Sequence, residues 1–151
     1  MQEFWTNALE NWASYFSNHA VVRTAIGFAH IAGLLAGGGF AISEDWAVLR
    51  GRRIVSLSGI HRVVILGLVA VTISGVLWLA SDPDTFIHSK LFWTKMGLMA
   101  LLLINGSLFV LAEKRIEVGD TSGFPKLKLT AMASLILWFL TTLAGSGLLN
   151  I

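Results

Sequence analysis

Four long apolar stretches constrain this chain more than any other feature of its sequence. Each has about the 20 helical residues that cross the hydrocarbon core of a bilayer, and they cover Val21–Ile42, Ile60–Ala80, Leu91–Ala112 and Leu127–Leu149. Of the 151 residues, 55% are hydrophobic and only 13% are charged, about half the charged fraction of an ordinary soluble domain. The sequence therefore predicts an all-α integral membrane protein, a four-helix bundle that forms one membrane domain over residues 1–151.

Lysine and arginine are distributed unequally between the two sides of this bundle. The loops that join the first span to the second and the third to the fourth, with their flanks, carry most of them: Arg50, Arg52, Arg53, Arg62, Lys114, Arg115, Lys126 and Lys128. The other side has Arg23, Lys90 and Lys95. Because basic loops stay in the cytoplasm, we expect a multi-pass protein of the bacterial inner (cytoplasmic) membrane with both termini outside.

The first 19 residues alternate aromatic and polar side chains near a helical period. The apolar positions are Phe4, Trp5, Leu9, Trp12, Tyr15 and Phe16. Such a pattern predicts a short amphipathic helix over residues 1–19, lying in the outer membrane interface, where aromatic rings with a polar tip are favoured. It serves either as an anchor for the first span or as a docking helix for a partner.

Composition also limits the chemistry that the chain can perform. The sequence has no cysteine, which excludes disulfides, thiolate metal sites and thiol nucleophiles. Its basic residues are spread over loops and form no patch with interleaved aromatics, so we expect no nucleic-acid partner. No phosphate-binding, dinucleotide-binding, zinc-hydrolase or serine-nucleophile motif is present.

A ridge of small residues runs along the first span at four-residue spacing: Ala25, Ala29, Gly33, Gly37 and Ala41. Small side chains let two helices approach closely inside lipid, where association relies on van der Waals contact. The sequence favours packing of this ridge within the chain. Contact with other membrane subunits, or a homo-oligomer through Ala29, Gly33 and Gly37, is the alternative.

Ionisable residues inside a span are costly and are therefore the first candidates for function. His30 near the middle of the first span and Lys95 near the outer end of the third could share one site in the outer half of the bundle. His88, in the outer loop, could form part of its lid. Met96 and Met99 follow Lys95 and offer soft sulfur ligands.

Four interpretations of this pair remain open. His30 could ligate haem iron, with Lys95 answering a propionate or acting as a ligand. With Met96 or Met99, His30 could instead bind copper, or it could shuttle protons. In the purely structural interpretation, His30 forms a hydrogen bond between helices while Lys95 reaches the interface.

Three ionisable residues near the cytoplasmic side are further candidates for functional or structural roles. His61 begins the second span, about 20 Å from His30 by helical rise, so one haem cannot take both as ligands and a second haem at another depth would be required. Glu44 and Asp45 follow the first span, and we expect them to form ion pairs with Arg50, Arg52, Arg53 and Arg62. A further set of polar residues is expected to tie helices together: Asn105, Ser107, Thr130, Ser134, Thr141 and Ser146.

Two segments resemble known families, namely Ala29–Gly33, with its histidine followed by small residues, and Phe92–Gly106. The chain resembles the small bacterial four-helix membrane proteins of the copper-resistance D-like and uncharacterised families. It is similar, more distantly, to the haem-dependent membrane protoporphyrinogen oxidases, in which a first-helix histidine and a third-helix lysine matter to haem binding. The resemblance implies those roles for His30 and Lys95. The segment Phe40–Trp46 departs from the oxidase pattern, so the oxidase activity is not carried over.

These observations favour a protein that binds haem b in the outer half of the bundle for electron transfer or redox chemistry, as a component of a membrane oxidoreductase. The residues expected at cofactors are His30, Lys95, His61 and His88, or His30, Met96 and Met99 for copper. The alternatives are a cofactor-free accessory or docking subunit of a larger membrane complex, and a copper-handling membrane protein.

Overall fold

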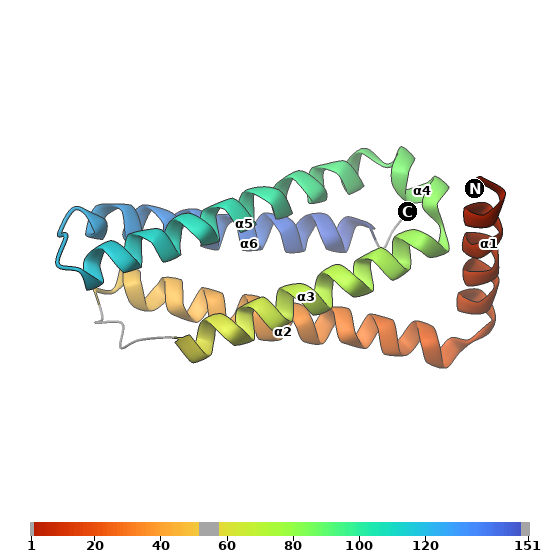
Figure 1. The fold of residues 1–151 in the computed structure, drawn as a ribbon, viewed down its shortest axis with the longest axis horizontal. Helices are drawn as coiled ribbons and strands as arrows, with labels where there is room; N and C mark the ends of the chain where they lie inside the picture. Colours follow the sequence, from red (N-terminus) through yellow and green to blue (C-terminus); the bar gives the residue numbers. More distant parts are fainter. Residues whose placement is uncertain (1, 52–57, 149–151) are drawn as a thin grey trace.

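The computed structural model describes residues 2–51 and 58–148, and all the regular elements in these segments are helices (Figure 1). In chain order they are α1 (Gln2–Asn18), α2 (Ala20–Leu49), α3 (Ser58–Ser81), α4 (Pro83–His88), α5 (Lys90–Glu117) and α6 (Gly123–Gly147). The predicted all-α fold is confirmed. Arg52 and Arg53, which contribute to the charge asymmetry, and Leu149, the predicted end of the last span, lie outside the described residues.

Four helices, α2, α3, α5 and α6, are long and apolar enough to cross a membrane. They contain nearly all of the described parts of the four predicted spans, and each begins before its apolar stretch or ends after it. α2 continues seven residues beyond Ile42, and α5 continues five residues beyond Ala112. The acidic residues that follow those stretches therefore lie on helices and not in loops.

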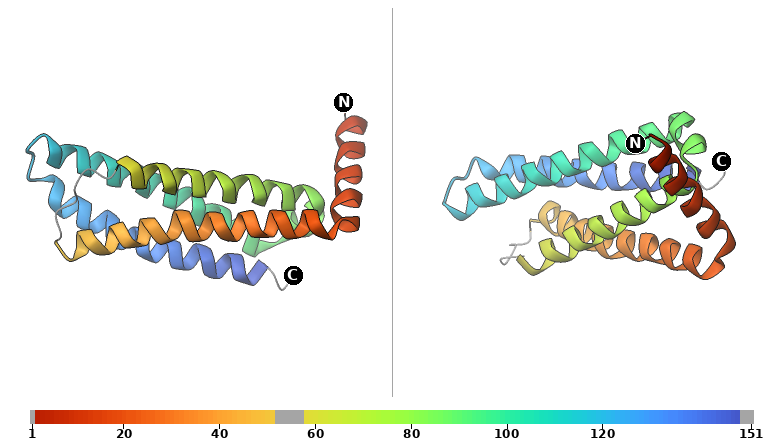
Figure 2. Two further views of the ribbon diagram at one scale, coloured as in Figure 1. Left: turned by 90° about the horizontal axis from the view of Figure 1, so that it is seen from below. Right: turned by 45° about the vertical axis from the view of Figure 1, so that its right-hand side comes forward.

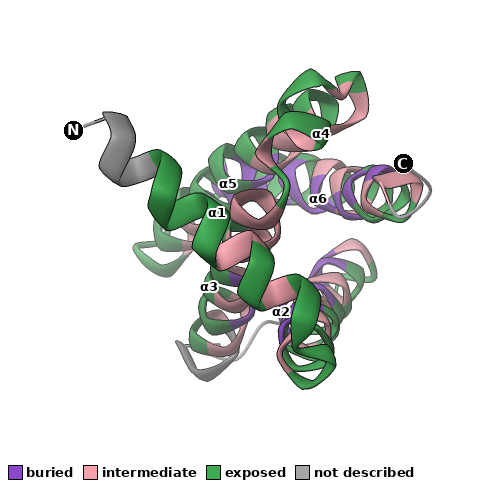
Figure 3. Cartoon of the chain, turned by 90° about the vertical axis from the view of Figure 1, so that its right-hand side faces the viewer, coloured by how far each residue is buried: buried purple, intermediate pink, exposed green. Residues whose placement is uncertain are grey.

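The four long helices form two antiparallel pairs. α2 packs along α3, and α5 packs along α6, while the two pairs meet mainly where α2 lies against α6 (Figure 1). α3 and α5 hardly touch. Figure 3 shows the bundle from the end at which α1 lies across the long helices. α1, α4 and the end of α6 lie at one end of the bundle. We call the opposite end, where α2 and α5 finish and α3 and α6 begin, the basic-loop end.

Glycines set the distance between α2 and α3. A Cβ atom at Gly67 of α3 would lie 2.5 Å from the backbone nitrogen of Gly37 and 2.7 Å from the carbonyl oxygen of Gly33. Only hydrogen fits there, because the two backbones are already in contact. Part of the small-residue ridge thus packs within the chain, as predicted. Gly33 and Gly37 are buried by this contact, whereas Ala29 remains exposed.

The best-buried apolar cluster lies toward the basic-loop end. It joins α2, α5 and α6 through Val48, Phe109, Ala112, Leu127 and Ala131. Next to it, Asn105 Nδ2 of α5 donates a hydrogen bond of 2.9 Å to the backbone carbonyl of Thr130 on α6. This bond confirms that Asn105 ties two helices together, and the cluster holds α5 and α6 in a fixed register.

α1 crosses the end of the bundle at a steep angle to the long helices (Figures 1 and 2). The Trp12 indole N–H donates a hydrogen bond of 2.9 Å to the carbonyl oxygen of Leu77 near the end of α3. The Arg23 guanidinium of α2 donates to the carbonyl oxygens of Phe16 and Ser17 at the end of α1. These contacts hold α1 across the end of the bundle. The side chains of Phe4 and Trp5 lie outside the described part of the structure.

Candidate functional site

His30 lies on the face of α2 that is turned into the bundle, and only 6% of the residue is exposed. Its Nδ1 atom is 2.9 Å from the hydroxyl oxygen of Ser74 on α3. The ring also lies against Trp78 of α3, with the two ring centroids 5.2 Å apart. Two neighbouring turns of α3 therefore fix both the position and the orientation of the imidazole.

The Ser74 hydroxyl determines which nitrogen of the ring carries the proton. It lies 2.6 Å from the carbonyl oxygen of Ala70 and 3.1 Å from that of Val71. A hydroxyl has one proton to donate, and the short contact to Ala70 uses it. The Ser74 oxygen is then an acceptor for Nδ1–H of His30. This tautomer leaves the lone pair on Nε2 for another partner.

Lys95 lies on the inward face of α5, in register with the buried Leu102 and Asn105. The side chain is half-buried, and its Nζ atom would lie 3.4 Å from a Cβ atom at Gly145 of α6. The ammonium group is also close enough to His30 to interact with it electrostatically. The structure thus brings together the two residues that the sequence placed in one site. No carboxylate among the described residues forms an ion pair with Lys95.

α6 contributes a buried hydroxyl one turn deeper than Gly145. Thr141 is only 4% exposed, and its Oγ1 atom has no hydrogen-bond partner. Thr130, on the same helix, bonds instead to backbone carbonyls of its own helix. A buried hydroxyl without a partner costs free energy of about 1–3 kcal/mol, which a polar ligand between the helices would relieve.

An apolar groove of about 300 Å³ opens between α3 and α5. Its lining residues are Ile65, Leu68, Val69, Thr72, Ile73 and Leu103. Since α3 runs from the basic-loop end toward α1, most of this groove lies deeper along α3 than Ser74. The groove is thus nearer to the basic-loop end than Ser74 is, and His30 is not among the residues that line it.

The remaining predicted cofactor residues are not gathered around His30. His88 is exposed at the end of α4, and its Nδ1 atom contacts the carbonyl oxygen of Asp84 at 2.8 Å. Met96 and Met99 are half-buried on α5, next to Lys95 and one turn beyond it. Among the described residues no group of three or more His, Asp or Glu side chains is arranged to hold a metal ion.

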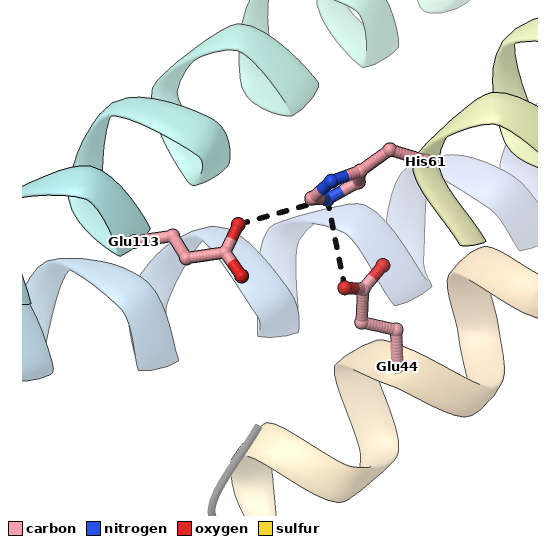
Figure 4. Close-up of polar contacts among 3 residues, drawn as sticks. All are labelled: Glu44, His61 and Glu113. Atoms are coloured by element: carbon pink, nitrogen blue, oxygen red, sulfur yellow. Dashed lines mark ion pairs between the residues drawn. The ribbon is translucent and has the colours of Figure 1, made fainter. Parts of the chain in front are cut away.

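The structure reveals a second polar site that the sequence interpretation missed. Glu44 and Asp45 are buried inside the bundle, and the arginine ion pairs predicted for them are not found in the described residues. Glu44 instead faces His61 of α3, which also faces Glu113 of α5 (Figure 4). For Arg50 and Arg62 the prediction was wrong, because α2 does not end at the acidic pair: the buried positions 30, 33, 37, 44 and 48 continue one helical face. That spacing was the signal available in the sequence. Arg52 and Arg53 lie outside the described residues.

Comparison with protein-family models, with curated proteins and with solved structures finds no match to this chain. The resemblance to the copper-resistance D-like and haem-dependent families therefore stays a prediction.

Proposed function

We propose that this chain is a small membrane protein that binds haem b. In this proposal the His30 Nε2 atom ligates the iron, and the Lys95 ammonium forms an ion pair with a haem propionate. One observation carries the proposal: His30 is buried inside a four-helix bundle with its Nδ1 atom 2.9 Å from the Ser74 hydroxyl, so Nε2 is the ring nitrogen that would ligate the iron. Haem b, when bound, supplies a one-electron carrier. The function that follows is electron transfer within a larger membrane oxidoreductase system.

The residues present fit such a group in three respects. An iron that already has four porphyrin nitrogens requires only one or two ligands from the protein, and His30 supplies one. The unpaired Lys95 ammonium complements a carboxylate. The orphaned Thr141 hydroxyl offers a polar contact on the deeper side.

The side chains around His30 have distinct tasks in this proposal. Ser74 holds the imidazole in one tautomer and one orientation, which raises its quality as a ligand. Trp78 covers the ring and helps to exclude water from it. Lys95 is the only lysine or arginine on the inner face of the described part of α5. Its charge would therefore orient an amphiphilic ligand, with the anionic groups of that ligand toward α1.

The proposed orientation follows the distribution of charge. Arg50, Arg62, Lys114 and Arg115 lie at the basic-loop end. Because basic loops stay in the cytoplasm, we assign that end to the cytoplasmic side of a bacterial inner membrane. The His30–Lys95 site then lies in the outer half of the bilayer. α1 lies across the outer end, where its Trp12 and Tyr15 rings suit the interface.

Absorption spectra of detergent-purified protein, oxidised and then reduced with dithionite, test this proposal after haem-supplemented expression. We expect a Soret band and a reduced α-band that are lost in His30→Ala and retained in His88→Ala, a control that removes an exposed histidine. Lys95→Met should weaken haem retention at least about tenfold, the effect of one lost charge-assisted hydrogen bond. Equal spectra for His30→Ala and the parent protein would refute His30 as the ligand.

A further inference from the structure

The second polar site lies at the basic-loop end, about 21 Å along α2 from His30. His61 Nε2 is 3.5 Å from Glu44 Oε1 and 3.7 Å from Glu113 Oε2 (Figure 4). The three residues come from α3, α2 and α5, which are far apart in the sequence. Three helices thus place one imidazole between two carboxyl groups, and we call these residues, with Asp45, the carboxylate–histidine cluster.

Exposure decreases from the histidine inward. The side chain of His61 is 28% exposed, that of Glu113 is 15% exposed and that of Glu44 is only 5% exposed. Asp45 beside Glu44 is 3% exposed and lies near enough to the Ser134 hydroxyl of α6 to interact with it. His61 is therefore the member of the cluster that is most accessible from outside, and Glu44 and Asp45 are enclosed.

Polar atoms in this cluster lack direct hydrogen bonds. Glu44 Oε1, Asp45 Oδ2 and His61 Nε2 are each buried without a hydrogen-bond partner. The distances from His61 to the two carboxyl groups exceed those of a normal hydrogen bond. An enclosed carboxyl oxygen without a hydrogen-bond partner lowers the stability of the fold unless it gains a partner.

Negative groups outnumber positive ones around the cluster. α2 contributes Glu44 and Asp45, α5 contributes Glu113 with Glu117 one turn further, α3 contributes His61, and α6 contributes only the Ser134 hydroxyl. The nearby basic residues of the described chain point outward and are exposed: Arg50, Arg62, Lys114 and Arg115. Arg50 stacks over the Trp46 ring instead. No described lysine or arginine forms an ion pair with the cluster.

One imidazole cannot compensate this set of carboxylates. His61 Nε2 holds a single proton, and it faces two carboxyl oxygens on different helices. Carboxylates that face one imidazole in an enclosed site favour the binding of a further proton, because burial and a neighbouring like charge both disfavour the ionised form. A proton is also the smallest cation that can reach an oxygen without moving the helices.

We propose that Glu44, His61 and Glu113 form a proton-binding site that is loaded from the basic-loop end of the bundle. His61 takes a proton from water and passes it from Nε2 to Glu44 Oε1. The carboxylate becomes a neutral carboxylic acid and the imidazolium returns to neutral imidazole, so charge and protons balance and no electron moves. The short move of the Glu44 or His61 side chain that closes the 3.5 Å gap completes the transfer.

Infrared spectroscopy of the full chain reconstituted in lipid vesicles tests this proposal without any cofactor. We expect a carbonyl stretch from a protonated carboxyl group at neutral pH, where exposed carboxylates are ionised. Glu44→Gln should remove this band, and the matched control Glu10→Gln, on the exposed surface of α1 at the other end of the bundle, should leave it unchanged. His61→Gln should shift the pH at which the band disappears. Circular dichroism verifies that each variant keeps its helix content, and Glu113→Gln replaces Glu44→Gln if the latter does not fold.

Two results would overturn the proposal. One is a folded parent protein without a protonated-carboxyl band at neutral pH, or with a band that Glu44→Gln and Glu113→Gln leave intact. The other is stoichiometric Zn²⁺ binding that both glutamine variants abolish, because the cluster would then hold a metal ion in place of the proton. Since no haem is used, neither result depends on the function proposed for His30.

Discussion

Replacing Gly67 with alanine perturbs the closest contact between two helices of this bundle. A Cβ atom at this position would lie 2.5 Å from Gly37 N, and ordinary contact begins at 3.4 Å, so α3 must retreat from α2 by about 0.9 Å. Overpacking of this kind costs about 1–3 kcal/mol. Alanine recovers about 1 kcal/mol through its higher helix propensity. The difference is a net loss of up to about 2 kcal/mol in the free energy of unfolding of Gly67→Ala.

The matched control is Gly39→Ala, because a Cβ atom at Gly39 of α2 would meet nothing within 4 Å. This variant gains helix propensity without a clash and should be as stable as the parent protein or more stable. Unfolding in mixed micelles of increasing sodium dodecyl sulfate content, followed by circular dichroism, measures both variants. If Gly67→Ala proves as stable as Gly39→Ala, α2 and α3 do not approach as closely as described and the packing argument is wrong.

Three further predictions concern other parts of the chain. Asn105→Leu loses the hydrogen bond to the Thr130 carbonyl and should lower the free energy of unfolding by about 1 kcal/mol in the same micelle titration; no change would mean that the bond is replaced or absent. Trp12→Phe loses the bond to the Leu77 carbonyl, so amide hydrogen exchange should become faster in α1 and stay the same in α2; equal acceleration in both helices would show global destabilisation instead. Hydrogen bonds from a loop serine hold the pKa of Asp120 below its usual value. The turn is therefore stabilised at pH values above the ordinary aspartate pKa, and it loses this stabilisation as the pH falls through the lowered pKa of Asp120. An NMR titration of the Asp120 carboxyl carbon measures this pKa, and a midpoint at the ordinary aspartate value would contradict the prediction.

The four long helices could be predicted from the sequence because each of them is indicated by the hydropathy of its own segment. A bilayer requires each spanning helix to be apolar over its whole length, and the run from Leu91 to Ala112 shows this without reference to any other segment. Chain order and loop length then give the antiparallel arrangement. The common depth of His30 and Lys95 followed from the same helical rise.

The faces that the helices turn toward one another could not be predicted so easily. In α3 and α5 nearly all side chains are apolar, so hydropathy does not indicate which side meets a neighbour. The partners Ser74 and Thr141 depend on this rotation, which is set by contacts such as that of Gly67 with Gly33. Small residues indicate that close packing occurs, but they do not identify the opposite helix.

The carboxylate–histidine cluster was missed for a different reason. Acidic residues after an apolar stretch usually mark the membrane interface, and Glu44 and Asp45 were interpreted in that way. Their burial results from long-range contacts with His61, Glu113 and Ser134, which come from three other helices. Nothing in the local sequence around position 44 specifies those partners, although its place on the buried face of α2 is visible.

The most direct test of the proposed function is the amount of haem in the purified parent protein. A pyridine haemochrome assay on protein from haem-supplemented cells, divided by the chain concentration, gives the stoichiometry. We predict close to one haem b per chain, bound through His30. A well-folded protein that carries no haem under these conditions would contradict it.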